Sequence, residues 1–302
     1  MKTGAIIQAR QGSSRLPGKA MIDIGGKPAL QRVVERIGAA KTLDTIVVAT
    51  TISEKDNPII ELCNKIGCNY YRGSEDDVLG RVLGAAKKFE INIICEATAD
   101  CLLIDASHID TLIAMHGDGS QFDMTMNCLE FTFPRGNEIR VFNREALERV
   151  NREVDNNLDR EHVSTWMFWN PTGKQNYRVQ NWEAPPEQRR PELAYTLDTP
   201  EDLELISWLY SFESSGYNLP NGLDCREIIN LIDAYPHMYK KVTEVQRKNY
   251  FMELAQAYEQ LRSEKLNEKV QNPNNRGRKP GSVKRPARKP KSKQDDFLRK
   301  GI

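Results

Sequence analysis

The chain of 302 residues has no long hydrophobic run, since no uncharged apolar stretch approaches the ~18 residues that a membrane-spanning helix needs. The apolar residues 5–7 are also too few for the hydrophobic region of a signal peptide, because Gln8 and Arg10 follow almost directly. These absences predict a cytoplasmic protein that does not enter a membrane.

Several patterns that would assign a function at once are missing. There is no Walker A motif, no GxGxxG fingerprint, no GxSxG nucleophile motif and no Asp-x-Asp pair. The cysteines show no CxxC and no metal-ligand spacing, which predicts reduced thiols rather than a disulfide framework. They stand in apolar segments, at positions 63, 68, 95, 101, 128 and 225.

The net charge of +1, from 43 basic and 42 acidic residues, hides a separation of charge along the chain. Residues 276–293 contain nine basic residues and no acidic one, whereas residues 1–275 contain 32 basic and 40 acidic residues. From residue 272 onward Pro, Gly, Asn, Lys and Arg dominate, and such a composition buries too little apolar surface to fold. We therefore expect a disordered basic tail over 272–302, attached to an acidic folded body.

The first half of the chain alternates strand and helix patterns. Runs of β-branched residues predict buried strands at 5–7, 45–50 and 91–95. Apolar residues at helical spacing predict helices at 28–38, 57–66 and 78–89. This alternation is typical of an α/β fold with a mixed, mostly parallel sheet, in which ligands bind beyond the carboxyl ends of the strands.

The second half is less regular. Strands are predicted at 122–126, 138–142, 177–182 and 194–197, and helices at 143–153, 159–168, 200–210, 224–233 and 238–270. The predicted domains are a nucleotide-binding domain at 1–216, a helical extension at 217–271 and the tail at 272–302. The long last helix carries an apolar seam, for which a neighbouring subunit or the chain's own domain could be the partner: Phe251, Leu254, Tyr258 and Leu261.

The stretch IIQARQGSSRLPGK at residues 6–19 carries the most chemical information. A strand leads into a loop of small residues that also contains three cations, Arg10, Arg15 and Lys19. Small residues let backbone N–H groups approach a phosphate closely, and the cations match its charge. The loop is predicted to bind phosphate, and the alternative is a solvated loop with surface charges.

This stretch resembles the opening of the cytidylyltransferase family of spore coat polysaccharide biosynthesis F-type proteins, which is related to acylneuraminate and 3-deoxy-manno-octulosonate cytidylyltransferases. Further similar motifs follow in the same order over residues 1–245: GGKP at 25–28, ATT at 49–51, RGSEDDVL at 72–79, TADCLLID at 98–105, REALER at 144–149, REHV at 160–163 and TLDTPEDLE at 196–204. The resemblance implies a Rossmann-like nucleotidyltransferase fold and an enzyme that joins a nucleoside triphosphate, with CTP expected, to a sugar and releases pyrophosphate.

The resemblance also assigns roles to individual residues. The residues implied to hold or act on the triphosphate are Ala9, Arg10, Gly12, Ser13, Arg15 and Lys19. Arg72, Ser74 and Thr98 are implied to contact the base. Asp100 and Asp198 are implied to bind Mg²⁺, which prefers carboxylate and phosphate oxygens. By itself, Asp100 is as typical of a helix cap or turn as of a metal ligand, and Asp198 is as typical of an N-cap before Thr199 and Pro200.

The sugar pocket is implied by four residues, each of which is also typical of a surface or helix-capping position: Glu138, Arg140, Arg160 and His162. The chain departs from the family's common TGDCPLID motif, since Ala99 and Leu102 stand in place of Gly and Pro. Gln11 stands where Met is frequent. These departures concern the surroundings of Asp100, and they leave the nucleobase and the sugar open.

Two other functions remain compatible with the sequence. A glycosyltransferase that uses a nucleotide sugar would share the layered α/β architecture, although its metal-dependent forms usually carry the Asp-x-Asp pair that is missing here. A non-catalytic binding protein would use the basic tail, with weak and non-specific contacts of residues 276–293 to nucleic acid or another polyanion. A solubilising or partner-docking role is the alternative for that tail.

Overall fold

The computed structural model describes every residue except 14, 171–175, 216–221, 246–254 and 261–302. The chain divides into two compact units, residues 1–247 and residues 248–302. In the second unit, the described residues 255–260 are helical. The first unit contains the sheet and all the predicted site residues.

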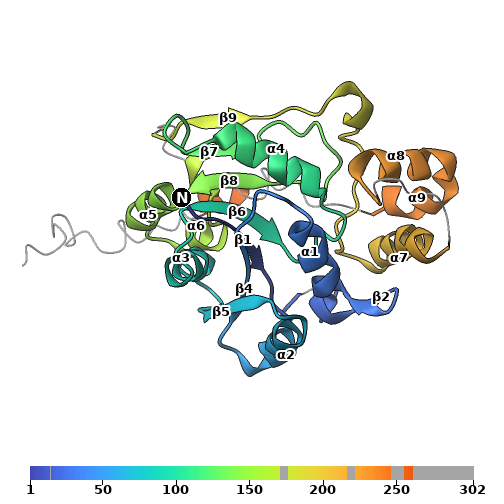
Figure 1. Cartoon of the computed structure of the whole chain (residues 1–302), viewed down its shortest axis with the longest axis horizontal. Helices are drawn as coiled ribbons and strands as arrows, with labels where there is room; N and C mark the ends of the chain where they lie inside the picture. Colours follow the sequence, from blue (N-terminus) through green and yellow to red (C-terminus); the bar gives the residue numbers. More distant parts are fainter. Residues whose placement is uncertain (14, 171–175, 216–221, 246–254, 261–302) are drawn as a thin grey trace, which may run out of the picture. The chain divides into compact units, whose positions relative to one another are not determined.

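A seven-stranded sheet forms the centre of the described part of this unit, in the order β5-β4-β1-β6-β8-β7-β9 (Figure 1). Its strands are β1 Thr3–Gln8, β4 Thr45–Thr51, β5 Asn69–Gly73, β6 Ile93–Thr98, β7 Met124–Met126, β8 Arg140–Asn143 and β9 Val179–Asn181. β5, β4, β1 and β6 are parallel, β8 is antiparallel to both of its neighbours, and β7 is parallel to β9. The prediction of a mixed, mostly parallel sheet is confirmed.

Helices cover both faces of the sheet (Figure 1). Their bounds are α1 Ala29–Gly38, α2 Asn57–Ile66, α3 Val78–Lys88, α4 Ala106–His116, α5 Arg144–Glu153, α6 Asn157–Glu161, α7 Pro200–Ser214, α8 Cys225–Ala234 and α9 Pro236–Thr243. α3, α5 and α6 lie on one face, and α1 and α4 lie on the other. A two-stranded hairpin, β2 Asp23–Ile24 and β3 Lys27–Pro28, precedes α1.

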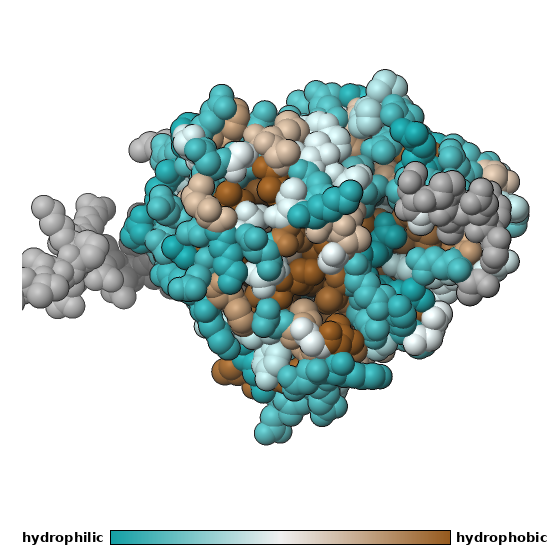
Figure 2. Space-filling model, viewed as in Figure 1, coloured by the Kyte–Doolittle hydropathy of each residue, from teal (hydrophilic) through white to brown (hydrophobic). Residues whose placement is uncertain are grey.

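The core lies between these layers. In β1, Ala5, Ile6 and Ile7 are fully buried, as expected for a strand with a helix layer on each side. α8 and α9 contribute to the same apolar cluster through residues such as Ile228 and Val242. Figure 2 shows apolar residues gathered toward the centre of the face in view, with hydrophilic residues around them.

The elements that were not predicted include α4 and β5, besides the short β2–β3 hairpin. The buried residues of α4 recur on one face, but they include the polar His108 and His116, so the sequence lacks the continuous apolar stripe that identifies a surface helix. β5 is an edge strand whose residues are only half-buried or exposed, and its sequence therefore shows no buried run.

Three predicted elements are corrected. The helix expected at 159–168 is replaced by the short α6 and a separate 3-10 turn at Thr165–Met167. The continuous helix expected at 238–270 is wrong, because α9 ends at Thr243 and a turn and a bend follow at residues 244–245. The strand expected at 194–197 is absent, since only Ala194 forms an isolated bridge, with Arg135.

Candidate active site

The loop after β1 is anchored by a buried carboxylate. Asp56, which is only 2 % exposed, accepts a hydrogen bond from the backbone N–H of Gln11 at 2.8 Å. The same carboxylate accepts hydrogen bonds from the hydroxyls of Thr50 and Thr51 at the end of β4. The N–H of Ala9 donates to a carbonyl of that strand. The loop that carries the predicted phosphate ligands is thus fixed beside the carboxyl ends of two parallel strands.

Lys19 joins the two acids that were predicted to share a metal ion. Its ammonium donates to Oδ2 of Asp100 at 2.7 Å, to Oδ1 of Asp198 at 3.0 Å and to the carbonyl of Leu197 at 3.1 Å. Arg15 adds an ion pair of 2.9 Å with the same oxygen of Asp198. Residues that lie 81 and 179 positions apart in the sequence from Lys19 therefore meet at one point.

The charges of this group stabilise one another. Burial opposes ionisation of Asp100, but the nearby Lys19 ammonium and the Thr98 hydroxyl, 2.5 Å from Oδ1, hold the pKa of that carboxyl below its usual value. Burial would likewise lower the pKa of Lys19, yet Asp100 and Asp198 raise it above its usual value. Both groups therefore stay charged across the neutral pH range.

Asp198 is positioned by backbone contacts rather than by a strand. The N–H of Leu197 donates to the carbonyl of Asp100 at 2.9 Å, and this bond holds the segment against the end of β6. The N–H groups of Asp198 and Thr199 both donate to the buried carboxylate of Asp202, each at 3.0 Å. Asp202 also completes the capping box of α7 with Thr199, so one residue sets both the helix start and the position of Asp198.

The donor set suits a hard divalent cation. Two carboxylates converge here, with room in the coordination sphere for phosphate oxygens and water, which is the usual environment of such an ion beside a nucleotide. Among the residues that the structure describes, no cluster of three or more His, Cys, Asp or Glu could hold a metal ion without such additional ligands. In this structure the ammonium of Lys19 lies between the two acids.

The other residues implied to contact the nucleotide lie in the loop after β1 and at the end of β5 and just beyond it. Arg72, at the end of β5, donates to the carbonyls of Thr51 and Ser53 at 2.8 and 2.9 Å. Arg10 lies 3.6 Å from Glu75, and the position of a Cβ on Gly12 would be 3.3 Å from the same carboxylate. The hydroxyls of two further residues accept hydrogen bonds from nearby backbone groups. The Ser13 hydroxyl accepts one from the N–H of Leu16, and the Ser74 hydroxyl accepts one from the N–H of Asp77.

Three of the four predicted sugar-pocket residues interact electrostatically, with Arg140 as the shared partner. Arg140 lies 3.8 Å from the buried Glu96 and stacks over the ring of Phe168. Glu138 and His162 both interact electrostatically with Arg140. Burial raises the pKa of Glu138 and lowers that of His162, so the imidazole is neutral at neutral pH.

The fourth predicted sugar-pocket residue, Arg160, pairs with a helix N-cap instead. Arg160 forms a bidentate ion pair with Asp77, the N-cap residue of α3, with N–O distances of 2.9 and 2.8 Å. Its Nη2 also donates to Asn151 of α5. These contacts connect three helices on one face of the sheet, which is a structural role that the sequence pattern did not predict.

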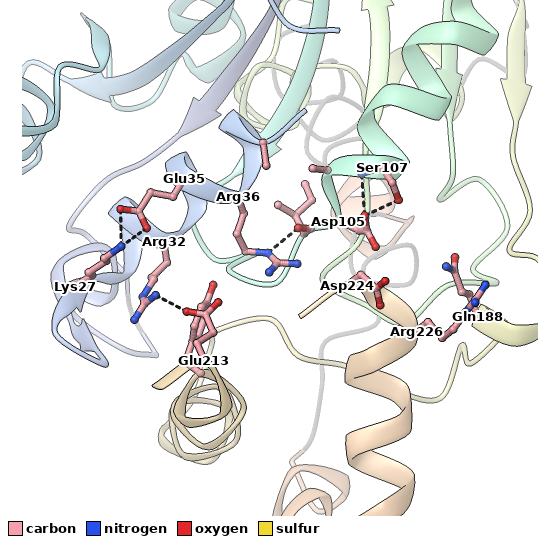
Figure 3. A pocket seen from close by; sticks show the side chains of 14 residues that line it. Lys27, Arg32, Glu35, Arg36, Asp105, Ser107, Gln188, Glu213, Asp224 and Arg226 are labelled. Atoms are coloured by element: carbon pink, nitrogen blue, oxygen red, sulfur yellow. Dashed lines mark hydrogen bonds and ion pairs between the residues drawn. The ribbon is translucent and has the colours of Figure 1, made fainter. Parts of the chain in front are cut away.

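A separate cavity of about 630 Å³ lies between α1, α7 and the start of α4 and α8 (Figure 3). Its charged side chains pair with one another, Lys27 with Glu35 and Arg32 with Glu213, each at 2.8 Å. None of the predicted site residues, all of which the structure describes, lines this cavity. The candidate active site is therefore assigned from the convergence of charged residues, not from the cavity.

Comparison with known proteins assigns the chain to a family. Residues 4–223 match the cytidylyltransferase family. The chain belongs to this family. It is therefore a nucleotidyltransferase, as the motifs predicted, and the family match gives no support to the glycosyltransferase alternative. Within the described residues, no helix is both long and apolar enough to cross a membrane.

Individual relatives cover most of the cytidylyltransferase chain. It is 34 % identical to the spore coat polysaccharide biosynthesis protein SpsF of Bacillus subtilis over 237 residues, which are 76 % of this chain and 94 % of the relative. It is also 34 % identical to the uncharacterized protein MJ1063 of Methanocaldococcus jannaschii, with 83 % and 98 % covered. The structure is similar to that of a cytidylyltransferase from Leptospira borgpetersenii, with a TM-score of 0.73, 29 % identity and coverage of 82 % and 100 %.

The sequence did not point to Asp56 or Asp202 as parts of the site. Asp56 stands just before a helix and reads as an ordinary acid of a helix start. Asp202 could be recognised only as the partner of Thr199 in a capping box, three residues along. Their contacts with the loop and with Asp198 depend on chain segments that meet only after folding.

Proposed function

We propose that this cytidylyltransferase transfers a cytidylyl group from CTP to a sugar with the help of Mg²⁺, in the cytoplasm, and supplies an activated sugar for a surface polysaccharide. The observation that carries the proposal is the meeting of Lys19 with Asp100 and Asp198, with Arg15 beside them. The name of the SpsF relative supports polysaccharide biosynthesis as the destination.

The reaction is a displacement at the α-phosphorus. A hydroxyl or phosphate oxygen of the sugar attacks, a new P–O bond forms, and pyrophosphate leaves with the electrons of the broken P–O bond. Arg10, Arg15 and Lys19 neutralise the charge that develops on the phosphoryl oxygens, and the hydrogen bond from the Gln11 N–H to Asp56 anchors the loop that carries these cations. No covalent intermediate with the protein is required.

Asp100 and Asp198 would hold the Mg²⁺ ion. The bound ion would supply positive charge next to the triphosphate, which otherwise meets two carboxylates. Ala9, Gly12 and Ser13 are proposed to approach the phosphates, and Arg72, Ser74 and Thr98 the base. Glu138, Arg140 and His162 are proposed to line the sugar pocket, whereas the position of Arg160 supports only an indirect role there through Asp77.

One assay tests this function. The purified protein is incubated with each of the four ribonucleoside triphosphates, MgCl₂ and a panel of sugars and sugar phosphates, and pyrophosphate release is measured. We expect release only when CTP and an accepted sugar are present together, and no release in excess EDTA. Sugar-dependent release with another triphosphate would overturn the base assignment, and full activity in EDTA would overturn the metal assignment.

A further inference from the structure

Two cysteines meet at the end of α2, away from the candidate active site. The helix ends at Ile66, and the following residue, Gly67, adopts a left-handed conformation with φ of 70°. The N–H of Cys68 then donates back to the carbonyl of Cys63 at 2.9 Å. This hydrogen bond folds the chain so that the residue after the glycine lies over the last helical turn, and side chains at these two positions are commonly in contact.

The two cysteines are neighbours across the helix end and differ in access. The Cys68 side chain raises the pKa of Cys63, and the Cys63 side chain lowers that of Cys68. Cys63 is fully buried, whereas Cys68 is half-buried and lines a surface cavity of about 360 Å³ between the ends of α1 and α2. The pair therefore combines a thiol that a small reagent can reach with a protected neighbour.

The other cysteines lack these properties. All six cysteines lie within the described residues and are free, and Cys95, Cys101, Cys128 and Cys225 are buried. Burial raises the pKa of Cys95 and of Cys225 to about 12 and that of Cys128 to about 11. A thiol reacts as the thiolate, so these groups are poor nucleophiles at neutral pH.

We propose that Cys63 and Cys68 form a reversible disulfide when the protein meets a hydroperoxide, with Cys68 as the attacking and Cys63 as the resolving residue. The Cys68 thiolate attacks one peroxide oxygen, an S–O bond forms, and the O–O bond breaks with release of hydroxide or alkoxide. The Cys63 sulfur then attacks Sγ of Cys68, an S–S bond forms, and the sulfenic oxygen leaves as water. Two thiols are thus oxidised while one peroxide is reduced.

The proximity of the two cysteines makes the second step fast relative to further oxidation. A sulfenic acid without a resolving thiol proceeds to sulfinic acid, which is irreversible for most proteins. Here the hydrogen bond from the Cys68 N–H to the Cys63 carbonyl already holds the resolving residue beside Cys68. The site therefore protects the half-buried thiol that immediately precedes β5, the strand that contains Arg72.

Peptide mapping of the full-length protein tests the site. The reduced protein is treated with hydrogen peroxide and then denatured, free thiols are alkylated in the denaturant, and trypsin is added. Trypsin cuts between the two cysteines, after Lys65, so a disulfide joins peptides 56–65 and 66–72. We expect this linked pair after peroxide and its loss on treatment with dithiothreitol. Recovery of the two peptides separately, both alkylated or with Cys68 as sulfinic acid, would overturn the proposal.

Single substitutions separate the two roles. In Cys63→Ala, Cys68 is expected to accumulate as a sulfenic acid that reacts with dimedone, and in Cys68→Ala, Cys63 is expected to remain alkylatable after peroxide. Cys95→Ala is the matched control, because it also removes a buried thiol but should leave the linked pair unchanged. If Cys63→Ala does not fold, the peptide map of the wild-type protein and the result for Cys68→Ala still test the disulfide. Dimedone labelling of Cys63 would contradict the assignment of Cys68 as the attacking residue.

Discussion

At the scale of single residues, the candidate site depends on opposite charges held within hydrogen-bond distance. Without a cation between them, Asp100 and Asp198 would repel each other and would also repel a triphosphate. Lys19 lies between the two carboxylates, and the pKa values of Lys19 and Asp100 are shifted so that both stay charged. The charges of the two acids are thus compensated within the protein by Lys19.

Neutralising either acid should lower the rate without unfolding the protein. We expect Asp100→Asn and Asp198→Asn each to reduce kcat by about 10²-fold or more, because each removes one electrostatic stabiliser while keeping the side-chain size. Pyrophosphate release at saturating substrates and thermal melting measure the two effects. Asp110→Asn is the control, since Asp110 bonds only to the chain near Lys41 and Thr42. An unchanged kcat in either site variant would contradict the assignment.

At the scale of elements, α3 is fixed at its N-terminus and at its middle. Its N-cap residue Asp77 pairs with Arg160, and its middle lies against β5, where Gly84 faces the ring of Tyr71. An added Cβ at Gly84 would lie 2.7 Å from Cζ of Tyr71, which is closer than real Cβ contacts. The helix therefore approaches the edge strand because one of its residues has no side chain.

Loss of the ion pair should destabilise the protein in a pH-dependent way. We expect Arg160→Met to lower the free energy of unfolding by about 1 kcal/mol at neutral pH. Burial opposes ionisation of Asp77, but Arg160 and the N–H of Gly80 hold its pKa below the usual value. The stabilisation is thus present above the unfolded-state pKa of about 3.9 and is lost as the pH falls through the lower folded-state pKa.

Urea unfolding of both proteins at pH 7 and at acidic pH provides the measurement. Arg189→Met is the matched control, because it breaks a pair with Glu183 in which both side chains are about half exposed, and it should change stability by less than ~0.5 kcal/mol. A difference for Arg160→Met that grows at acidic pH would refute this account. If the KM for the sugar is unchanged in Arg160→Met, the role of Arg160 is structural and does not include binding of the sugar.

Filling the space at Gly84 should cost stability even though alanine favours helices. We expect Gly84→Ala to lower the free energy of unfolding by about 1–3 kcal/mol, since Tyr71 or the helix must move. Gly38→Ala in α1 is the control, because its Cβ would meet only Ile46, at an ordinary 3.5 Å, and should stabilise by up to ~1 kcal/mol. Urea unfolding compares them, and equal effects of the two substitutions would rule out the crowding.

At the scale of the whole molecule, the sequence joins an acidic body to a basic tail. The nine basic residues of 276–293 lie outside the described residues, so their role rests on composition. We propose weak, non-specific binding of polyanions by this tail, with affinity that falls steeply as salt increases.

Truncation after residue 271 tests the tail. The full chain should be retained on heparin at low salt, whereas the truncated chain should elute early, because the remaining body has an excess of acids. Retention is read from the salt concentration at elution. The truncated protein should keep the kcat of pyrophosphate release, and equal retention of the two chains would exclude an electrostatic role.

The apolar seam of the C-terminal segment predicts a homodimer. Tyr258 lies in the described helical residues 255–260, while Phe251, Leu254 and Leu261 lie outside the described residues. Light scattering at micromolar concentration should give a dimer for the full chain and for residues 1–271, and a monomer for residues 1–245. A monomeric full chain would remove the proposed subunit contact.

The sequence by itself determined the alternation of strands and helices, the loop after β1 and the start of α7. These features depend on neighbouring residues, namely apolar periodicity, small residues beside cations, and the capping pair Thr199 and Asp202. The convergence of Asp100 and Asp198 was also predicted, but from an assumed strand at 194–197 that the fold replaces with backbone hydrogen bonds.

Only the tertiary structure decided which distant groups meet. Arg160 pairs with Asp77, 83 residues away, and Gln11 is anchored by Asp56, 45 residues away. Such contacts depend on the packing of separate elements, and a buried carboxylate accepts whichever donors the fold brings to it. The sequence pattern shows that these residues are charged or polar, but not which partner compensates their burial.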